Sequence, residues 1–119
     1  MFEIVALMVL SQQPVQPVVE GVATYYTVAS SSRVTASGEV MRDTAYTCAM
    51  RKGRFGTDYL VVAENGNSVV CRLNDRGPYV KNRVIDLSRA AMRALVGNAG
   101  MAYVKVYRLD SGVSPAPPR

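Results

Sequence analysis

The sequence predicts a mainly β protein, a small β-barrel with one helix. Six short runs of β-branched and aromatic residues are spread along the chain and separated by turn residues. Asn65-Gly66 lies between two of these runs and is the strongest short-range hairpin signal in the chain. Only the segment from about 87 to 97 has helical spacing. Several short strands and one helix fit a small barrel better than a sandwich or a parallel sheet.

The six strands are predicted from alternating or continuous apolar runs. Because Asn65-Gly66 forms the turn, the third and fourth strands should pair antiparallel. The last strand alternates apolar and polar residues, as a half-buried strand does. In chain order we expect strands at residues 22–26, 46–50, 59–63, 68–73, 84–87 and 103–108.

The predicted helix follows directly on the fifth strand. Ser88 can cap its first turn and Gly97 can end it. Its apolar face consists of Leu87, Ala91, Ala94 and Leu95.

A chain of 119 residues can bury one core, so we expect one domain, at residues 21–109. Residues 1–20 read as an N-terminal segment and linker. Their first ten residues are either a signal remnant or an ordinary strand, and are too short to span a bilayer. Residues 110–119 have the composition of a disordered tail.

The net charge of +5 favours a polyanionic partner. The basic residues are scattered without a run, so we do not expect a nucleic-acid partner. With no histidine and no Cys-x-x-Cys spacing, Cys48 and Cys71 make a poor metal site, and we expect neither a metal nor a cofactor. The two cysteines lie in predicted strands of one sheet system and are either a disulfide or two buried thiols.

The segment from residue 68 to 87 is predicted to be strand, corner, strand, helix. Gly77-Pro78 forces a rigid turn directly after Asp75, because glycine takes dihedrals closed to other residues and proline fixes its own φ. The turn therefore holds a carboxylate at a strand end. The alternative is an Asx-turn, in which Asp75 only bonds its own backbone.

The corner Asn74-Asp-Arg-Gly-Pro-Tyr79, with residues 83–91 after it, resembles the RlpA-like (rare lipoprotein A) family, which is related to barwin and expansins. Further segments resemble family motifs in the same order. They are Gly21-Val-Ala-Thr-Tyr-Tyr26, Thr35-Ala-Ser-Gly-Glu39, residues 47–57 and residues 65–70. The resemblance covers about residues 21–109 and implies a six-stranded double-psi β-barrel with one or two short helices.

The family includes lytic transglycosylases, which cleave the β-1,4 link between N-acetylmuramic acid and N-acetylglucosamine in peptidoglycan strands stripped of stem peptides. By position, the resemblance implies that Asp75 is the catalytic acid and base and that Glu39 is the second acidic residue. A single carboxyl group suffices if it is protonated at working pH, which requires a partly desolvated site. The resemblance further implies an extracytoplasmic monomer, in the periplasm, cell wall or medium, acting on glycan strands.

Substrate binding is expected to involve aromatic rings and a guanidinium beside Asp75. Tyr25, Tyr26 and Tyr79 would stack on sugar faces, unless they are core or rim aromatics. Arg76 would place the substrate, unless it forms a structural salt bridge, for instance to Asp86.

Met50 stands where the family has a histidine, and methionine cannot donate a proton or orient a carboxylate. Two hypotheses follow. The protein either keeps lytic activity through Asp75 or is a glycan-binding, expansin-type module that has lost the chemistry. A third class, an assembly or nucleic-acid-associated module, stays open because double-psi barrels also occur there.

Overall fold

The computed structural model describes residues 15–31 and 33–109. The predicted signal region and most of the linker, and the predicted tail over residues 110–119, lie outside these ranges. The described chain has six strands and the helix α2 (Arg89–Val96), with a short 3-10 turn η1 (Val28–Ser30) after the first strand. The strands are β1 (Val19–Tyr25), β2 (Thr47–Ala49), β3 (Asp58–Ala63), β4 (Ser68–Asp75), β5 (Arg83–Leu87) and β6 (Ala102–Leu109).

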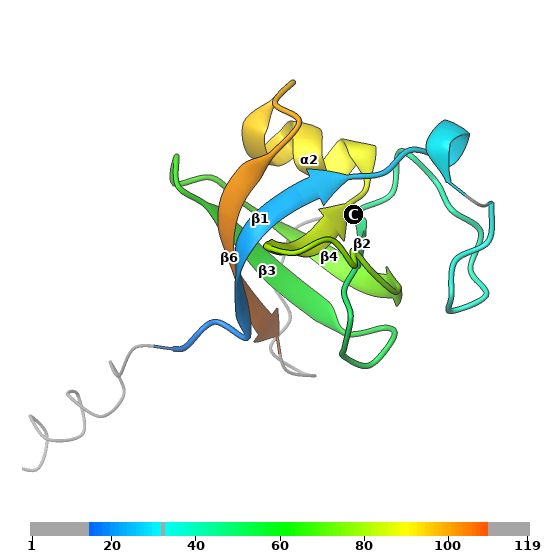
Figure 1. Cartoon of the computed structure of the whole chain (residues 1–119), viewed down its shortest axis with the longest axis horizontal. Helices are drawn as coiled ribbons and strands as arrows, with labels where there is room; N and C mark the ends of the chain where they lie inside the picture. Colours follow the sequence, from blue (N-terminus) through cyan, green and yellow to red (C-terminus); the bar gives the residue numbers. More distant parts are fainter. Residues whose placement is uncertain (1–14, 32, 110–119) are drawn as a thin grey trace, which may run out of the picture.

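The strands close into a barrel in the order β1-β5-β2-β4-β3-β6 (Figure 1). The sheet is mixed. The pairs β1/β5 and β2/β4 are parallel, and the other four pairs are antiparallel. The predicted mainly β barrel with six strands and a helix is therefore confirmed.

The predicted hairpin is the β3/β4 pair, which runs antiparallel from Asp58 opposite Arg72 to Val62 opposite Ser68. Its turn uses Gly66 at φ 90°, where a side chain would be strained, and Asn65 accepts the amide of Asn67 through Oδ1. The side-chain amides of Asn65 and Asn67 both donate to the carbonyl of Leu95. The hairpin tip thus satisfies a carbonyl in the last turn of α2, which would otherwise lack a partner.

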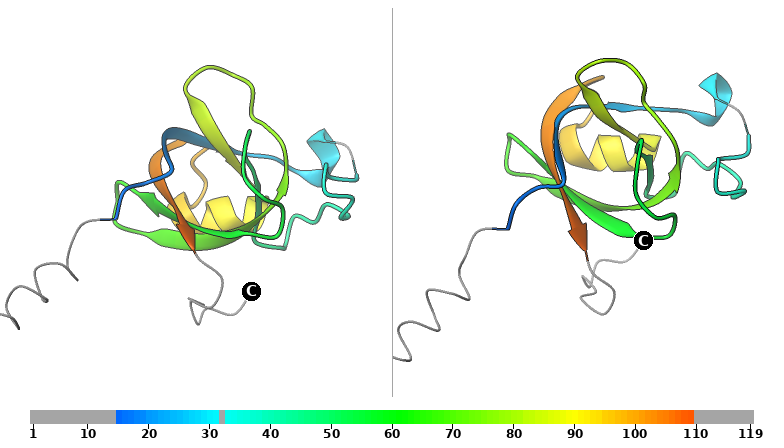
Figure 2. Two further views of the ribbon diagram at one scale, coloured as in Figure 1. Left: turned by 90° about the horizontal axis from the view of Figure 1, so that it is seen from below. Right: turned by 60° about the horizontal axis from the view of Figure 1, so that its bottom comes forward.

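Helix α2 begins and ends where the sequence predicts. The Ser88 hydroxyl accepts the amide of Ala91, and the Gly97 amide donates to the carbonyl of Arg93. The helix lies beside the barrel and buries Ala91, Met92 and Leu95 against it (Figures 1 and 2).

The barrel core comes from alternating positions on the strands, as a two-residue period requires. In β3, for example, Tyr59, Val61 and Ala63 are buried while their neighbours are partly exposed.

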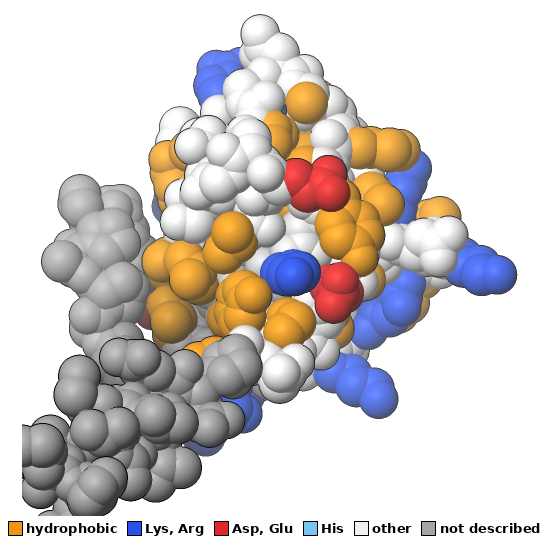
Figure 3. Space-filling view, turned by 90° about the vertical axis from the view of Figure 1, so that its left-hand side faces the viewer, with side chains coloured by type: hydrophobic (Ala, Val, Ile, Leu, Met, Phe, Trp, Pro, Cys, Tyr) orange, Lys and Arg blue, Asp and Glu red, His pale blue; other side chains and the backbone are white. Residues whose placement is uncertain are grey.

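No helix in residues 15–31 and 33–109 is long and apolar enough to cross a membrane. At the centre of one face, hydrophobic side chains surround single basic and acidic ones (Figure 3).

Candidate active site

Asp75 is the last residue of β4, at the corner predicted from the sequence. The β2/β4 register shifts after Cys48, so Ala49 pairs with Asp75, and the amide of Met50 donates to the Asp75 carbonyl at 3.2 Å. The backbone of Asp75 is therefore held by strand pairing up to the point where the chain turns.

One oxygen of the Asp75 carboxylate is fixed and the other is available. Oδ1 accepts the amides of Ala36 and Arg76, both at 2.9 Å. No described residue donates to Oδ2, and this atom is not among the buried polar atoms that lack a partner. The bond from Arg76 is local, because it comes from the next residue in the chain, whereas the bond from Ala36 comes from a distant loop. The carboxyl group thus has a defined orientation and one oxygen free for a ligand.

The loop that reaches Asp75 is a tight turn over residues 35–38. The amide of Gly38 donates to the carbonyl of Thr35 at 2.9 Å, and Gly38 has φ 91°. The amide of Ser37 donates to the carbonyl of Asn74 at 3.1 Å. The turn therefore lies across the end of β4 and brings the Ala36 amide to Asp75.

Glu39 lies at the base of this turn, and its carboxylate is fully engaged. Arg72 Nη1 and Nη2 donate to Glu39 Oε1 and Oε2, each at 2.6 Å, and the Asn74 side-chain amide adds a bond of 3.1 Å to Oε1. These bonds, first of all the one with Arg72, hold the pKa of Glu39 below its ordinary value. Glu39 therefore anchors the loop to β4 as a carboxylate and is poorly suited to donate a proton.

Arg76 braces a second loop instead of pointing at an acid. Its Nη2 donates to the carbonyl of Gly53 at 2.7 Å, and its guanidinium lies 4.1 Å from the centre of the Phe55 ring. The suggested salt bridge to Asp86 is not what the structure shows, because Asp86 accepts the Thr24 hydroxyl. The buried Nη1 of Arg76 has no partner among the described residues.

The three tyrosines expected to bind sugars lie in different environments. Tyr26 is only 6% exposed and shares a hydrogen bond of 2.6 Å with Thr47, so it is a core side chain and cannot serve as a stacking surface. Burial raises the pKa of its hydroxyl. Tyr25 is half-buried beneath the guanidinium of Arg89, 4.8 Å from its ring centre. Tyr79 is 75% exposed, so its ring is open to a ligand.

Met50, which the resemblance aligns with the family histidine, is a buried side chain. It lines a pocket of about 330 Å³ together with Val18, Val19, Arg51, Lys52 and Val84. None of the other side chains around this pocket is a proton donor suited to neutral pH. Because the sequence contains no histidine, chemistry at Asp75 would have to proceed without an imidazole.

Two residues that the sequence did not single out organise the site. Arg72 follows the buried Cys71 on β4, and its side chain is partly exposed. The alternation of buried and exposed residues along a strand was the signal in the sequence that Arg72 could have a partner on the surface. Arg51 directly follows Met50 and donates to the carbonyls of Pro78, Val80 and Arg83. No local pattern announces Arg51, because its partners lie 27 to 32 residues away.

Cys48 and Cys71 are both fully buried in the barrel core and are free thiols in this structure. Burial, together with a hydrogen bond to Cys71, raises the pKa of the Cys48 thiol. In the described part of the chain, no three His, Cys, Asp or Glu side chains lie close enough to hold a metal ion.

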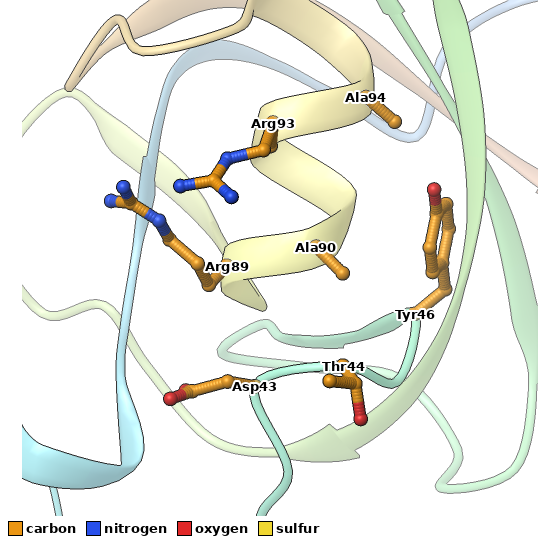
Figure 4. Close-up of a pocket in the computed structure, with 7 residues that line it drawn as sticks. All are labelled: Asp43, Thr44, Tyr46, Arg89, Ala90, Arg93 and Ala94. Carbon is orange, nitrogen blue, oxygen red and sulfur yellow. The ribbon is translucent and has the colours of Figure 1, made fainter.

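A groove of about 520 Å³ lies away from these residues, between α2 and residues 43–46 (Figure 4). Figure 4 shows Arg89 and Arg93 projecting from the same side of α2, while Ala90 and Ala94 face the segment that carries Tyr46. Neither Asp75 nor Glu39 lines this groove. This groove is therefore separate from the Asp75 corner.

Comparison with known proteins matches residues 18–106 to the family model described as "Lytic transglycolase". The chain is 48% identical over 93 residues to the probable endolytic peptidoglycan transglycosylase RlpA of Treponema pallidum, covering 76% of this chain and 29% of that protein. It is 41% identical over 90 residues to the endolytic peptidoglycan transglycosylase RlpA of Pasteurella multocida, covering 73% of this chain and 30% of that protein. The chain thus spans less than a third of the length of these relatives.

Solved structures share the fold at lower identity. A mutant expansin of Clavibacter michiganensis in complex with cellohexaose superimposes with a TM-score of 0.62 at 20% identity, covering 81% of this chain and 52% of that one. The Streptomyces papain inhibitor superimposes with a TM-score of 0.59 at 21% identity, covering 80% of this chain and all of that one. A carbohydrate-bound protein and a protease inhibitor share this barrel, so the fold alone does not decide the function.

Proposed function

Because this chain belongs to the lytic transglycolase family of double-psi β-barrel domains, we propose that it is an endolytic lytic transglycosylase that acts on peptidoglycan glycan strands, with Asp75 as acid and base. The observation that carries the proposal is the Asp75 carboxyl group, oriented through Oδ1 by two backbone amides and with Oδ2 unoccupied. The substrate would be strands stripped of stem peptides, in an extracytoplasmic compartment.

The proposed reaction needs one proton carrier. The Asp75 carboxyl group would donate its proton to the glycosidic oxygen as the bond from C1 of N-acetylmuramic acid to O4 of N-acetylglucosamine breaks. The C6 hydroxyl of the same N-acetylmuramic acid then bonds to C1 and gives its proton to Asp75. The products are a free 4-hydroxyl and a 1,6-anhydro ring, no water is consumed, and the carboxyl group is protonated again.

The surrounding residues support this role by position rather than by proton transfer. Ala36 and Arg76 supply the amides that orient the carboxyl group, and Glu39 holds the Ala36 turn through Arg72. We propose that Glu39 stays ionised during turnover, because its pKa is lowered and both of its oxygens are engaged. Tyr79 offers the open aromatic surface for a sugar ring.

A second candidate function is favoured by one observation, the buried Met50 at the histidine position. A missing proton carrier commonly lowers a rate by orders of magnitude. The protein would then bind glycan strands without cleaving them.

Mass spectrometry of peptide-free glycan strands, incubated with the chain, tests the proposal through the appearance of 1,6-anhydromuramyl ends. The parent chain should produce them, and Asp75→Asn should lower the rate by at least about 100-fold. Asparagine keeps an Oδ1 acceptor for both amides, so the variant should fold and still sediment with the strands. Asp43→Asn is the matched control, because Asp43 also accepts a backbone amide, from Val28 at 2.9 Å, but lies in the groove of Figure 4.

The outcomes separate the two functions. Ends produced by the parent chain and by Asp43→Asn, but not by Asp75→Asn, establish the lytic enzyme. If the parent chain produces no ends and still sediments with the strands, the glycan-binding function replaces it.

A further inference from the structure

The guanidinium of Arg51 connects two loops of the barrel. Its Nε donates to the carbonyl of Pro78 at 2.7 Å, and its Nη2 donates to the carbonyls of Val80 and Arg83 at 2.9 and 2.8 Å. Arg51 lies in the loop from β2 to β3. Two of its acceptors, Pro78 and Val80, belong to the connection from β4 to β5, and the third, Arg83, is the first residue of β5. One side chain therefore binds two backbone carbonyls of another loop and the carbonyl at the start of the strand that follows it.

Two of these carbonyls bracket Tyr79, since they belong to the residues directly before and after it. The Tyr79 ring is also close to the backbone at the corner. A Cβ atom placed on Gly77 would lie 3.7 Å from Cε2 and 3.8 Å from Cδ2 of that ring. The ring therefore lies over Gly77. Because 75% of Tyr79 is exposed, the rest of the ring faces solvent. Gly77 is two residues after Asp75, so this surface adjoins the catalytic corner.

The loop has few other restraints. The amide of Arg83 donates to the Val80 carbonyl at 3.1 Å, and the amide of Val22 donates to the Asn82 carbonyl at 2.9 Å. Both bonds lie after Tyr79 in the chain. Pro78 has no amide hydrogen, so its carbonyl is the only backbone group of this residue that can form a hydrogen bond. Arg51 supplies that bond.

We propose that Arg51 is a positioning residue that fixes Tyr79 as a sugar-stacking platform beside Asp75. The inference rests on the proposed function, because it assigns the platform to the pyranose ring next to the scissile link. A ring held in place before binding loses less conformational entropy when a ligand docks, and the ligand therefore binds with higher affinity. Lysine cannot replace the arginine, because one ammonium group cannot reproduce a planar fork directed at three carbonyls.

The test compares Arg51→Gln and Arg51→Lys with the parent chain on peptide-free glycan strands. Both variants should raise KM by about three- to tenfold and change kcat by less than about twofold, because the platform acts in binding. Arg54→Gln is the matched control. It removes the same charge from the same loop, and no described residue bonds to the Arg54 side chain. It should leave both constants unchanged.

A double-mutant cycle tests whether Arg51 acts through Tyr79. The dissociation constant for the strands is measured in the Asp75→Asn background, so that binding is read without cleavage. Tyr79→Ala should weaken binding, and adding Arg51→Gln to it should cause no further loss, because the residue that Arg51 positions is gone. Additive losses, or full affinity in Arg51→Lys, would mean that Arg51 contacts the strand by its charge and would overturn the inference.

Hydrogen exchange of the peptide covering residues 77–83 supplies a readout without any glycan. Arg51→Gln should speed exchange there and leave the β3/β4 hairpin unchanged, whereas Arg54→Gln should change neither. If the Asp75→Asn chain binds strands but Arg51→Gln alters neither affinity nor exchange, the inference fails alone. If exchange increases as expected but neither the parent nor any variant binds strands, the proposed function fails. The role of Tyr79 in glycan binding then fails as well.

Discussion

Arg72 and Glu39 meet in a two-point pair, with Nη1 to Oε1 and Nη2 to Oε2 both at 2.6 Å. The pair joins the outer side of β4 to the turn that delivers the Ala36 amide to Asp75. A charged pair of this geometry is stronger than a single ionic contact. However, 38% of the Glu39 side chain is exposed to solvent. Solvent screening therefore reduces the contribution of the pair to stability.

Glu39→Gln should lower the free energy of unfolding at pH 7 by about 0.5–1 kcal/mol. The pKa of Glu39 is lowered in the folded protein, so its contribution is complete above the unfolded value and is lost as pH falls through the folded value. The difference between parent and variant should therefore be complete above about pH 5 and shrink as pH falls below the ordinary glutamate pKa of about 4.3. Urea denaturation across that range measures it, with Glu64→Gln on the exposed hairpin turn as the control. A deficit that persists at low pH would show that the loss is one of packing.

Ala36→Pro should isolate the amide that orients Asp75. Ala36 is the second residue of the turn closed by Gly38 and Thr35, a position that proline favours, so the substitution mainly removes one N–H donor. We expect kcat on glycan strands to fall by roughly tenfold with little change in KM, because the carboxyl group loses one of two restraints. Ala36→Ser keeps the amide and should behave as the parent. Equal loss in both variants would place the effect in the side chain.

Gly53→Ala should destabilise the loop that Arg76 braces. A Cβ atom at Gly53 would lie 2.6 Å from the Tyr59 hydroxyl and 2.8 Å from Leu73 Cδ2, at φ 114°. Gly56 has φ 91° with nothing within 4 Å of its Cβ position, so Gly56→Ala carries the backbone strain without the clash. The free energy of unfolding of Gly53→Ala should be about 1–3 kcal/mol below that of Gly56→Ala. Equal stability of the two variants would mean that Tyr59 moves aside freely.

The two core thiols should be unreactive in the folded protein. Cys48 and Cys71 are fully buried, and burial raises the pKa of Cys48, which suppresses the reactive thiolate. A thiol reagent at pH 7 should label neither residue in buffer and both in denaturant, with no reductant added. Labelling of neither residue in denaturant would reveal a disulfide in the purified protein.

The sequence alone determined the elements that depend on neighbouring residues. Alternating or continuous apolar runs located all six strands, Asn65-Gly66 specified the hairpin, and Ser88 and Gly97 bounded the helix. The rigid Gly77-Pro78 turn also placed Asp75 at a strand end. These features could be predicted because turn dihedrals, helix caps and side-chain period are set within a few residues.

Only the tertiary structure decided which distant groups meet. It paired Glu39 with Arg72, turned Arg76 to Gly53 rather than to Asp86, and buried Tyr26 while exposing Tyr79. The residues next to an arginine or a tyrosine in the sequence do not indicate which distant group its side chain contacts. Its partner depends on how the barrel closes and on the register that core packing sets. The closed barrel brings together residues far apart in the chain, such as Arg72 and Glu39, which are 33 positions apart.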